Sequence, residues 1–297
     1  MVRPSLTPPH AALALLVMAI WGTNFVVIKL ALAHLPPMTF AALRFTFAAL
    51  PAVFVLKRPA TPWRTLAVYG MLIGVGQFGL LYIAMRGSIS PGLASLVIQT
   101  QAFFTIGLAT AFTGERLRGF QILALLLATA GLGWLMAHAG SEVSPLGLGL
   151  VLTAAMSWAL GNTVQRQANP PDMLAFVVWS SLFAVPPLFA LAFAVDGPAA
   201  VIHGLTQSTP ATWAAVLWQS AGNTLFGYAA WGWLLARYPA ATISPLALLV
   251  PVFGMVASAM LLGESLAVWK VTAAALVLSG LALNTLWPMI QRRVAAT

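Results

Sequence analysis

Long apolar stretches separated by short polar breaks run along the whole chain. Each stretch has about 20 residues, the length that an α-helix needs to cross the hydrocarbon core of a bilayer. The breaks carry proline, glycine and charge, as in Lys57-Arg58-Pro59, which is typical of connections. The pattern predicts ten transmembrane helices, near 11–32, 38–56, 66–85, 92–112, 120–137, 146–165, 173–195, 213–235, 242–262 and 267–287.

Composition supports this interpretation. Of the 297 residues, 61% are hydrophobic and only 6% are charged, whereas a soluble domain carries roughly 25% charged residues. The apolar runs do not alternate with polar positions, which favours helices over a transmembrane β-barrel. There is no cysteine, so disulfides, thiol catalysis and thiolate metal sites are excluded. We therefore predict an all-α integral membrane protein.

The formal net charge of +9 would be compatible with a nucleic-acid partner. However, the basic residues gather in short connections on alternate sides of the predicted spans, as topology signals do. With the N-terminus inside, ten of the 14 Lys and Arg residues fall on the inner side. The sequence thus predicts both termini in the cytoplasm and no nucleic-acid partner. The first apolar run is too long for a signal peptide, so we expect it to be retained as a span.

The two halves of the chain resemble each other. Residues 76–82 (Gly-Gln-Phe-Gly-Leu-Leu-Tyr) align with residues 222–228 (Gly-Asn-Thr-Leu-Phe-Gly-Tyr) at an offset of 146. Each half holds five predicted helices, an odd number, so the second half would enter the membrane inverted. We expect one membrane domain made of two repeats, 1–140 and 141–297. Inverted repeats build secondary transporters with a site near mid-membrane, although a repeat can also be only a relic of gene duplication.

Polar and aromatic residues inside the spans are the candidates for such a site. Trp21 and Asn24, and likewise Trp158 and Asn162, lie three or four residues apart and share a helical face. For each buried amide, the alternative role is an interhelical hydrogen bond worth about 0.6–2 kcal/mol. The predicted cavity residues are Trp21, Asn24, Gln77, Tyr82, Gln99, Gln101, Trp158, Asn162, Gln165, Trp179, Ser180, Gln219, Asn223, Tyr228, Trp231 and Ser244.

Charged residues narrow the chemistry. All five acidic residues lie at loops or helix ends, and the lack of a mid-membrane carboxylate argues against an antiporter of cationic drugs and protons. Arg44 lies several residues inside the second span; we expect it to snorkel outward, the alternative being contact with a substrate carboxylate. The four histidines fall at span ends, which predicts no metal site. Pro251 lies inside a span and is a candidate hinge.

Three motifs carry a resemblance to a known family. They are Trp21-Gly22-Thr23-Asn24-Phe25, Gly114-Glu115-Arg116-Leu117 and Gly263-Glu264-Ser265-Leu266. Together with the two five-helix halves, they resemble the EamA family of the drug/metabolite transporter superfamily, over nearly the whole chain. Within it, the chain is most similar to bacterial amino-acid exporters of the cysteine/O-acetylserine or aromatic amino-acid type. One departure is Gln101, where many members carry a proline; the proline at 251 is kept.

The resemblance implies ten helices in two inverted repeats around a central cavity, in the bacterial inner membrane. It also implies outward transport of amino acids and related small, neutral or zwitterionic metabolites by alternating access, without a cofactor. Carriers of drugs or nucleotide sugars remain alternatives. A membrane-embedded enzyme would need a nucleophile–base pair or a metal cluster, which the sequence does not suggest, and a channel is a further alternative. The oligomeric state, including a monomer, stays open.

Overall fold

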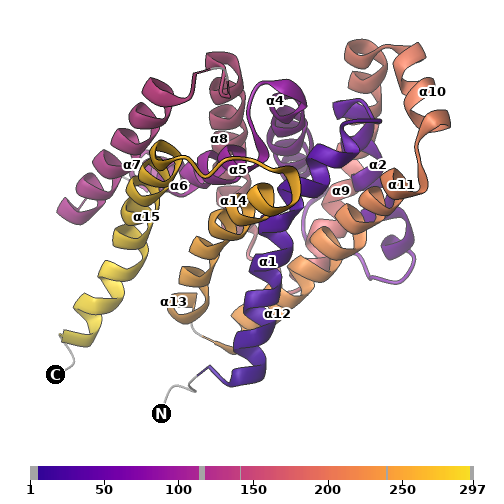
Figure 1. The fold of residues 1–297 in the computed structure, drawn as a ribbon. Coiled ribbons are helices and arrows are strands. Elements are labelled where there is room, and N and C mark those ends of the chain that lie inside the picture. The colour runs from indigo at the N-terminus through magenta and orange to yellow at the C-terminus, as the bar shows by residue number, and fades with distance from the viewer. Residues whose placement is uncertain (1–5, 114–117, 141, 239, 295–297) are drawn as a thin grey trace.

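The computed structural model describes residues 6–113, 118–140, 142–238 and 240–294, without the side chains of 109, 110, 112, 113, 240, 241, 244 and 292–294. Over the described residues the fold is helical and contains no strand (Figure 1); Ile89 and Val143 form a single antiparallel bridge. The predicted all-α class is confirmed. The motif 114–117 and the side chain of Ser244 lie outside the described residues.

The helices follow the predicted order. Up to residue 140 they are α1 (Pro8–Ala31), α2 (Pro37–Val53), α3 (Trp63–Gly70), α4 (Leu80–Gly87), α5 (Pro91–Val97), α6 (Gln101–Thr113) and α7 (Gly119–His138). After it they are α8 (Pro145–Ala168), α9 (Met173–Leu191), α10 (Pro198–Gln207), α11 (Pro210–Leu217), α12 (Gly227–Arg237), α13 (Ala240–Ile243), α14 (Leu249–Leu262) and α15 (Val268–Val294).

Short irregular segments join several of these helices into continuous runs. π-Helical segments, which pair residues five apart, connect α3 to α4 (Met71–Gly79) and α11 to α12 (Trp218–Phe226). Segments of 3₁₀-helix connect α5 to α6 (Ile98–Thr100) and α13 to α14 (Ser244–Leu248). Irregular turns of this kind inside helices often occur at functional sites.

Local sequence explains where the helices begin and end. Proline occupies the first turn of α1, α2, α5, α8, α10 and α11, where its missing N–H costs no hydrogen bond. The hydroxyl of Ser144 accepts from the backbone N–H of Gly147 and caps α8. At the other end of α8, Asn169 adopts a left-handed conformation with φ 41°, which stops the helix.

Eight helical runs within the described residues are long and apolar enough to cross a membrane. They do not include α2, which has only 17 residues, or the α11–α12 run. The latter carries a patch of buried polar residues, Gln219, Ser220, Asn223 and Thr224. Helix α10 was not predicted, because its residues were expected to form a connection. It packs closely against Pro36 at Gly204: a Cβ atom placed on this glycine would lie 2.8 Å from Pro36 Cδ.

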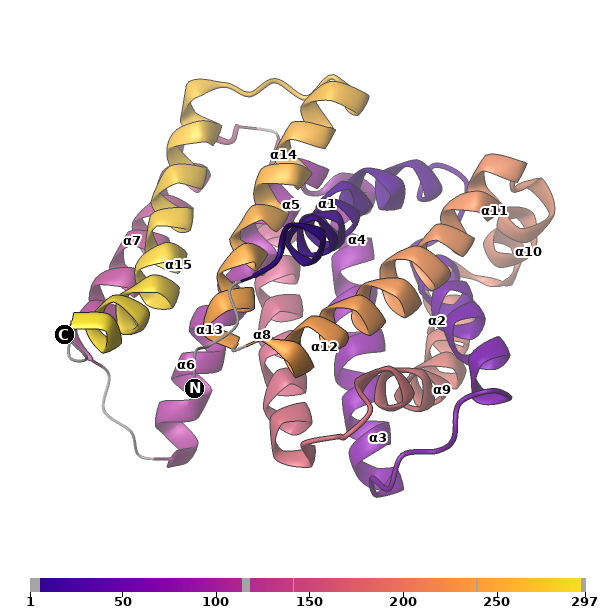
Figure 2. The same ribbon diagram turned by 90° about the horizontal axis from the view of Figure 1, so that it is seen from below.

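Helices from the two halves pack against each other in a repeating pattern. Helix α1 packs on α14 and α12, while α8 packs on α6 and on the α3–α4 run. Helix α2 packs on α9, and α5 on α14. Helices α7 and α15 form a pair along one side of the molecule (Figure 2).

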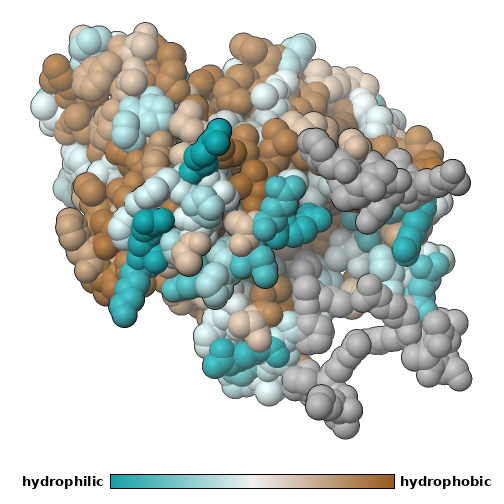
Figure 3. Space-filling model, turned by 180° about the vertical axis from the view of Figure 1, so that it is seen from behind, coloured by the Kyte–Doolittle hydropathy of each residue, from teal (hydrophilic) through white to brown (hydrophobic). Residues whose placement is uncertain are grey.

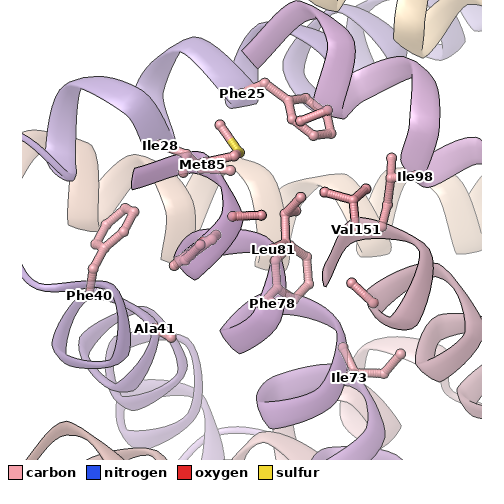
Figure 4. Close-up of a cluster of buried hydrophobic side chains, with 14 of the residues drawn as sticks. Phe25, Ile28, Phe40, Ala41, Ile73, Phe78, Leu81, Met85, Ile98 and Val151 are labelled. Carbon is pink, nitrogen blue, oxygen red and sulfur yellow. The ribbon is translucent and has the colours of Figure 1, made fainter. Parts of the chain in front are cut away.

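A buried hydrophobic cluster fills the space between α1, α2 and α4. It includes Phe25, Ile28, Phe40, Leu81 and Met85 (Figure 4). Large hydrophobic side chains also cover the outside, where residues such as Met260 are 79% exposed. Figure 3 shows hydrophobic residues spread over one face, interrupted by a few strongly hydrophilic side chains. Such a surface fits a lipid environment, because soluble proteins rarely expose this much apolar area to water.

Candidate functional site: a central cavity

A cavity of about 430 Å³ lies between the halves, within the range of sites for small molecules. Helices of both halves contribute to its wall. The predicted residues that line it are Trp21, Asn24, Gln77, Gln99, Gln101, Trp158, Asn162, Gln165, Asn223, Tyr228 and Trp231. Within the described ranges, no three His, Asp or Glu side chains gather into a metal site. These predicted residues therefore offer neutral amides, indoles and the phenol of Tyr228.

One wall is aromatic and fixed in place. The indole N–H of Trp21 donates to the backbone carbonyl of Asn223 at 3.2 Å, which ties α1 to the π-helical segment before α12. The same indole contacts Tyr228 and Trp231, with ring centroids 5.8 and 5.5 Å apart. Because the aromatic contacts and the hydrogen bond fix the position of the Trp21 side chain, the cavity presents a rigid aromatic face to a ligand.

A second part of the wall carries amides. The side-chain N–H of Asn162 donates to Gln101 Oε1 at 3.0 Å and links α8 to α6. Trp158, Asn162 and Gln165 follow the i, i+4, i+7 spacing of one helical face, and all three line the cavity. Gln101 thus has a side-chain partner in α8.

Two amides on the wall keep unused hydrogen-bonding capacity. Asn24 and Gln77 are each 4% exposed, and Oδ1 of the first and Oε1 of the second are buried without a partner. A buried amide oxygen without a donor costs about 1–3 kcal/mol. Because an amide presents both donors and an acceptor, each of these side chains can bind a polar ligand that enters the cavity.

Four predicted residues with described side chains, Tyr82, Trp179, Ser180 and Gln219, do not line the cavity. Ser180 is fully buried in α9. Tyr82 is fully buried and accepts a hydrogen bond from Arg44 at 3.0 Å. Trp179 lies two turns into α9, where its indole N–H donates to the Leu56 carbonyl at 3.2 Å. Gln219 and Asn223 are four residues apart, the spacing that shares one face in a regular α-helix, but both lie in a π-helical segment. In such a segment residues four apart no longer superpose, and Gln219 is buried away from the cavity.

The expectation that Arg44 snorkels outward is wrong. Its side chain is fully buried and donates to Tyr82, Asn223 and Thr224 over 2.9–3.3 Å. The guanidinium also lies 3.6 Å from the ring centre of Phe78. The buried guanidinium is stabilised by acceptors on neighbouring helices. The sequence of α2 alone does not show that these acceptors are within reach.

The sequence analysis missed part of the wall. Tyr69 and Thr285 line the cavity, and no repeat or amide pair pointed to them. The apolar residues Phe25 and Ile28 also line it. With Trp21 and Asn24 they form an i, i+3, i+4, i+7 series, so helical spacing alone could have found them.

The cavity reaches toward one end of the molecule. Both termini lie at this end (Figure 1), which we call the termini end. Gln165 and Met173, which flank the connection from α8 to α9 at this end, line the cavity. The connections at the other end, the opposite end, contribute no lining residue among those described. These connections comprise residues 32–36, 88–90, 139–140, 142–144, 197–209 and 263–267.

An all-helical membrane protein with a polar, aromatic-walled central cavity has the build of a solute transporter. The chain belongs to the EamA-like transporter family, which it matches over residues 9–137 and again over 145–286. This finding confirms the predicted family and a transporter rather than an enzyme.

Individual relatives extend the comparison. The chain is 41% identical over 278 residues to the "Probable amino-acid metabolite efflux pump" of Escherichia coli strain K12, covering 92% of this chain and 93% of that protein. A protein of the same name from Salmonella typhimurium strain LT2 is 39% identical, with 94% and 96% covered. A crystal structure 19% identical in sequence has a TM-score of 0.63 over 95% of this chain and 100% of its own. At that identity, the similarity concerns the fold alone.

Proposed function

We propose that the protein exports amino acids and related small, neutral or zwitterionic metabolites across the bacterial inner membrane by alternating access. The observation that carries the proposal is the cavity of about 430 Å³, whose amides and indoles come from both halves. Amide groups suit the carboxylate and ammonium of an amino acid. The aromatic faces suit an apolar side chain or the ammonium group. The printed names of the two relatives point to the same class of cargo.

The architecture that we propose is ten spanning helices in two inverted five-helix repeats, 1–140 and 141–297. The packing supports this arrangement, because each packed pair has an equivalent when the two halves are exchanged. The pair α1 with α14 becomes α8 with α6, while the pairs α2 with α9 and α7 with α15 stay the same. The π-helical segments Met71–Gly79 and Trp218–Phe226 and the 3₁₀ segments Ile98–Thr100 and Ser244–Leu248 also occur at corresponding places in the two halves, whereas the π-helical segment Ala192–Asp196 has no counterpart in the described first half. The family matches the chain twice, once in each half. Sites between such repeats lie near mid-membrane.

The outward direction that we propose is supported by the family and by the printed names of the two relatives. Basic residues favour cytoplasmic termini, so the termini end would face the cytoplasm. The cavity, which reaches this end, would then face the cytoplasm in this conformation. Pro251, in the first turn of α14 directly after a 3₁₀ segment, is the hinge we propose for the change of access.

Proteoliposomes provide the test. Vesicles loaded with unlabelled amino acid should accumulate labelled amino acid by counterflow, and a panel of amino acids should compete. Counterflow distinguishes a carrier from a channel, because a channel does not couple two opposite fluxes. Failure of the whole panel to be transported would sink the proposal. An imposed pH gradient without effect on the rate would favour facilitated diffusion over proton coupling.

A further inference from the structure

A small recess adjoins the cavity beside Arg44. Its volume is about 10 Å³, and Arg44 and Ser180 supply polar groups to its wall. Tyr69, Phe78 and Tyr228 line both the recess and the cavity. Because three side chains are common to both walls, the recess is a continuation of the cavity toward α2 and α9.

The guanidinium in this recess has no anionic partner within the described chain. Arg44 donates to the neutral oxygens of Tyr82, Asn223 and Thr224. The described acids are placed elsewhere: Glu142 pairs with Lys270, Asp172 caps α9, Asp196 accepts from Thr39, and Glu264 lies beside Gly92. An arginine stays charged in any protein environment, so the recess holds a buried, uncompensated positive charge.

A second group in the recess is open to a ligand. The hydroxyl of Ser180 is fully buried and has no hydrogen-bond partner. A space of this size accommodates about one water-sized oxygen atom. A guanidinium and an unpartnered hydroxyl that both line a space for one oxygen form a site that suits an oxyanion.

Asn223 connects the recess to the cavity. Its Oδ1 accepts from Arg44 Nη2 at 2.9 Å, which fixes the orientation of the amide and leaves its NH₂ group to donate elsewhere. Asn223 also lines the main cavity. One oxygen of a carboxylate could therefore enter the recess while the other remains at the Asn223 amide.

We propose that the recess is the subsite that binds the substrate carboxylate, with Arg44 and Ser180 as its determinants. The inference rests on the proposed function and adds a selection rule to it. Compounds with a free carboxylate are preferred over amides and amines of the same shape. A purely structural Arg44 would tie α2 to the α11–α12 run equally well, but it would not discriminate between an acid and its amide.

The test compares each acid with its carboxamide. Purified protein is titrated with L-phenylalanine, L-leucine and L-serine and with the three corresponding amides. Wild type should prefer the acids. Arg44→Gln should weaken acid binding about 10- to 100-fold, the range for a hydrogen bond to a charged group, and leave amide binding unchanged. Arg44→Lys should restore part of the preference, because it keeps the charge.

Lys29→Gln is the matched control. Lys29 is a half-buried cation whose amine donates to the Met85 carbonyl at 3.4 Å, and its loss should not change the ratio of acid to amide affinity. Size-exclusion profiles and melting curves establish that each variant folds. If Arg44→Gln does not fold, Ser180→Ala decides, with an expected loss of about three- to tenfold for the acids only.

The outcomes separate the two proposals. Wild type that binds acids and amides equally, or a folded Arg44→Gln that keeps the acid preference, overturns the subsite and leaves the transport proposal standing. If Ser180→Ala is the deciding variant, an unchanged preference for acids over amides likewise overturns the subsite and leaves the transport proposal standing. Wild type that neither binds nor transports any amino acid of the panel overturns the proposed function, and the carboxylate subsite with it.

Discussion

The two ends of the molecule are built differently. At the opposite end, connections far apart in the sequence are bound together: the backbone N–H of Ser144 donates to the Ser88 carbonyl at 2.9 Å, and Lys270 pairs with Glu142. At the termini end, α1 and the residue after α12 meet through side chains, in the 2.6 Å contact between His10 and the Tyr238 hydroxyl. Gln165 and Met173 of the cavity wall also lie at this end. We therefore expect access to be controlled at the opposite end, where backbone groups of separate connections meet.

Small residues make that closure possible. Helix α5 crosses α14 so closely that a Cβ added at Gly254 would lie 2.6 Å from Ser95 Cβ. One turn further toward the opposite end, a Cβ at Gly92 would lie 3.4 Å from Ser258 Cβ. Such contacts bring backbones together, and alternating access would require them to separate.

The largest expected effect comes from locking this crossing. A disulfide needs Cβ atoms about 3.5–4.5 Å apart, close to the geometry of Gly92 and Ser258. Oxidation of a Gly92→Cys/Ser258→Cys double variant should abolish counterflow in proteoliposomes, because the opposite end cannot open. Reductant should restore the flux. The native chain has no cysteine, so either single variant is a clean control. Full transport by the cross-linked protein would show that the barrier lies elsewhere.

Thiol labelling sharpens the comparison between the ends. A cysteine at Gln165 lines the cavity near the termini end, whereas one at Ser258 is fully buried. A membrane-impermeant thiol reagent should modify Gln165→Cys faster than Ser258→Cys, by about tenfold or more, because reactivity follows exposure. Added amino acid should protect position 165. Equal labelling rates would contradict a cavity that is reached from the termini end alone.

The proposed hinge tests how the closed end could open. Pro251→Ala restores an N–H to the first turn of α14, next to the 3₁₀ segment that precedes it. We expect transport to slow several-fold while substrate affinity is kept, because the turn can then continue as regular helix. Wild-type transport by Pro251→Ala would remove the hinge. The control is Pro210→Ala at the start of α11, since this proline lies outside the crossing of α5 and α14.

Sequence reasoning located the helices well because their signals are local. Length and apolarity predict a span without knowledge of its neighbours, and prolines at the first turn of α1, α5 and α8 mark where helices begin. The same logic failed for α10, whose ten residues are too few to register as a span. It also could not foresee the π-helical segments, which depend on tertiary packing.

The site was predicted in part for a similar reason. Trp158, Asn162 and Gln165 share one face of a regular helix, and all three line the cavity. The prediction failed for Gln219, where the helix is not regular, and for Arg44, whose acceptors come from other helices. Spacing reports which residues share a helix face, but only the packed structure decides which face meets the cavity.

The smallest expected effect concerns the ion pair at the opposite end. Glu142 is 39% exposed at its side chain, and partly exposed pairs contribute about 0.2–1 kcal/mol. If the pair holds this end closed, Glu142→Gln should increase thiol labelling of Ser258→Cys about two- to fivefold, the population shift that such an energy allows. The charge-exchanged double variant Glu142→Lys/Lys270→Glu should reverse the increase, because it restores the attraction. Labelling that stays unchanged in Glu142→Gln would assign the closure to the small-residue crossing of α5 and α14 alone.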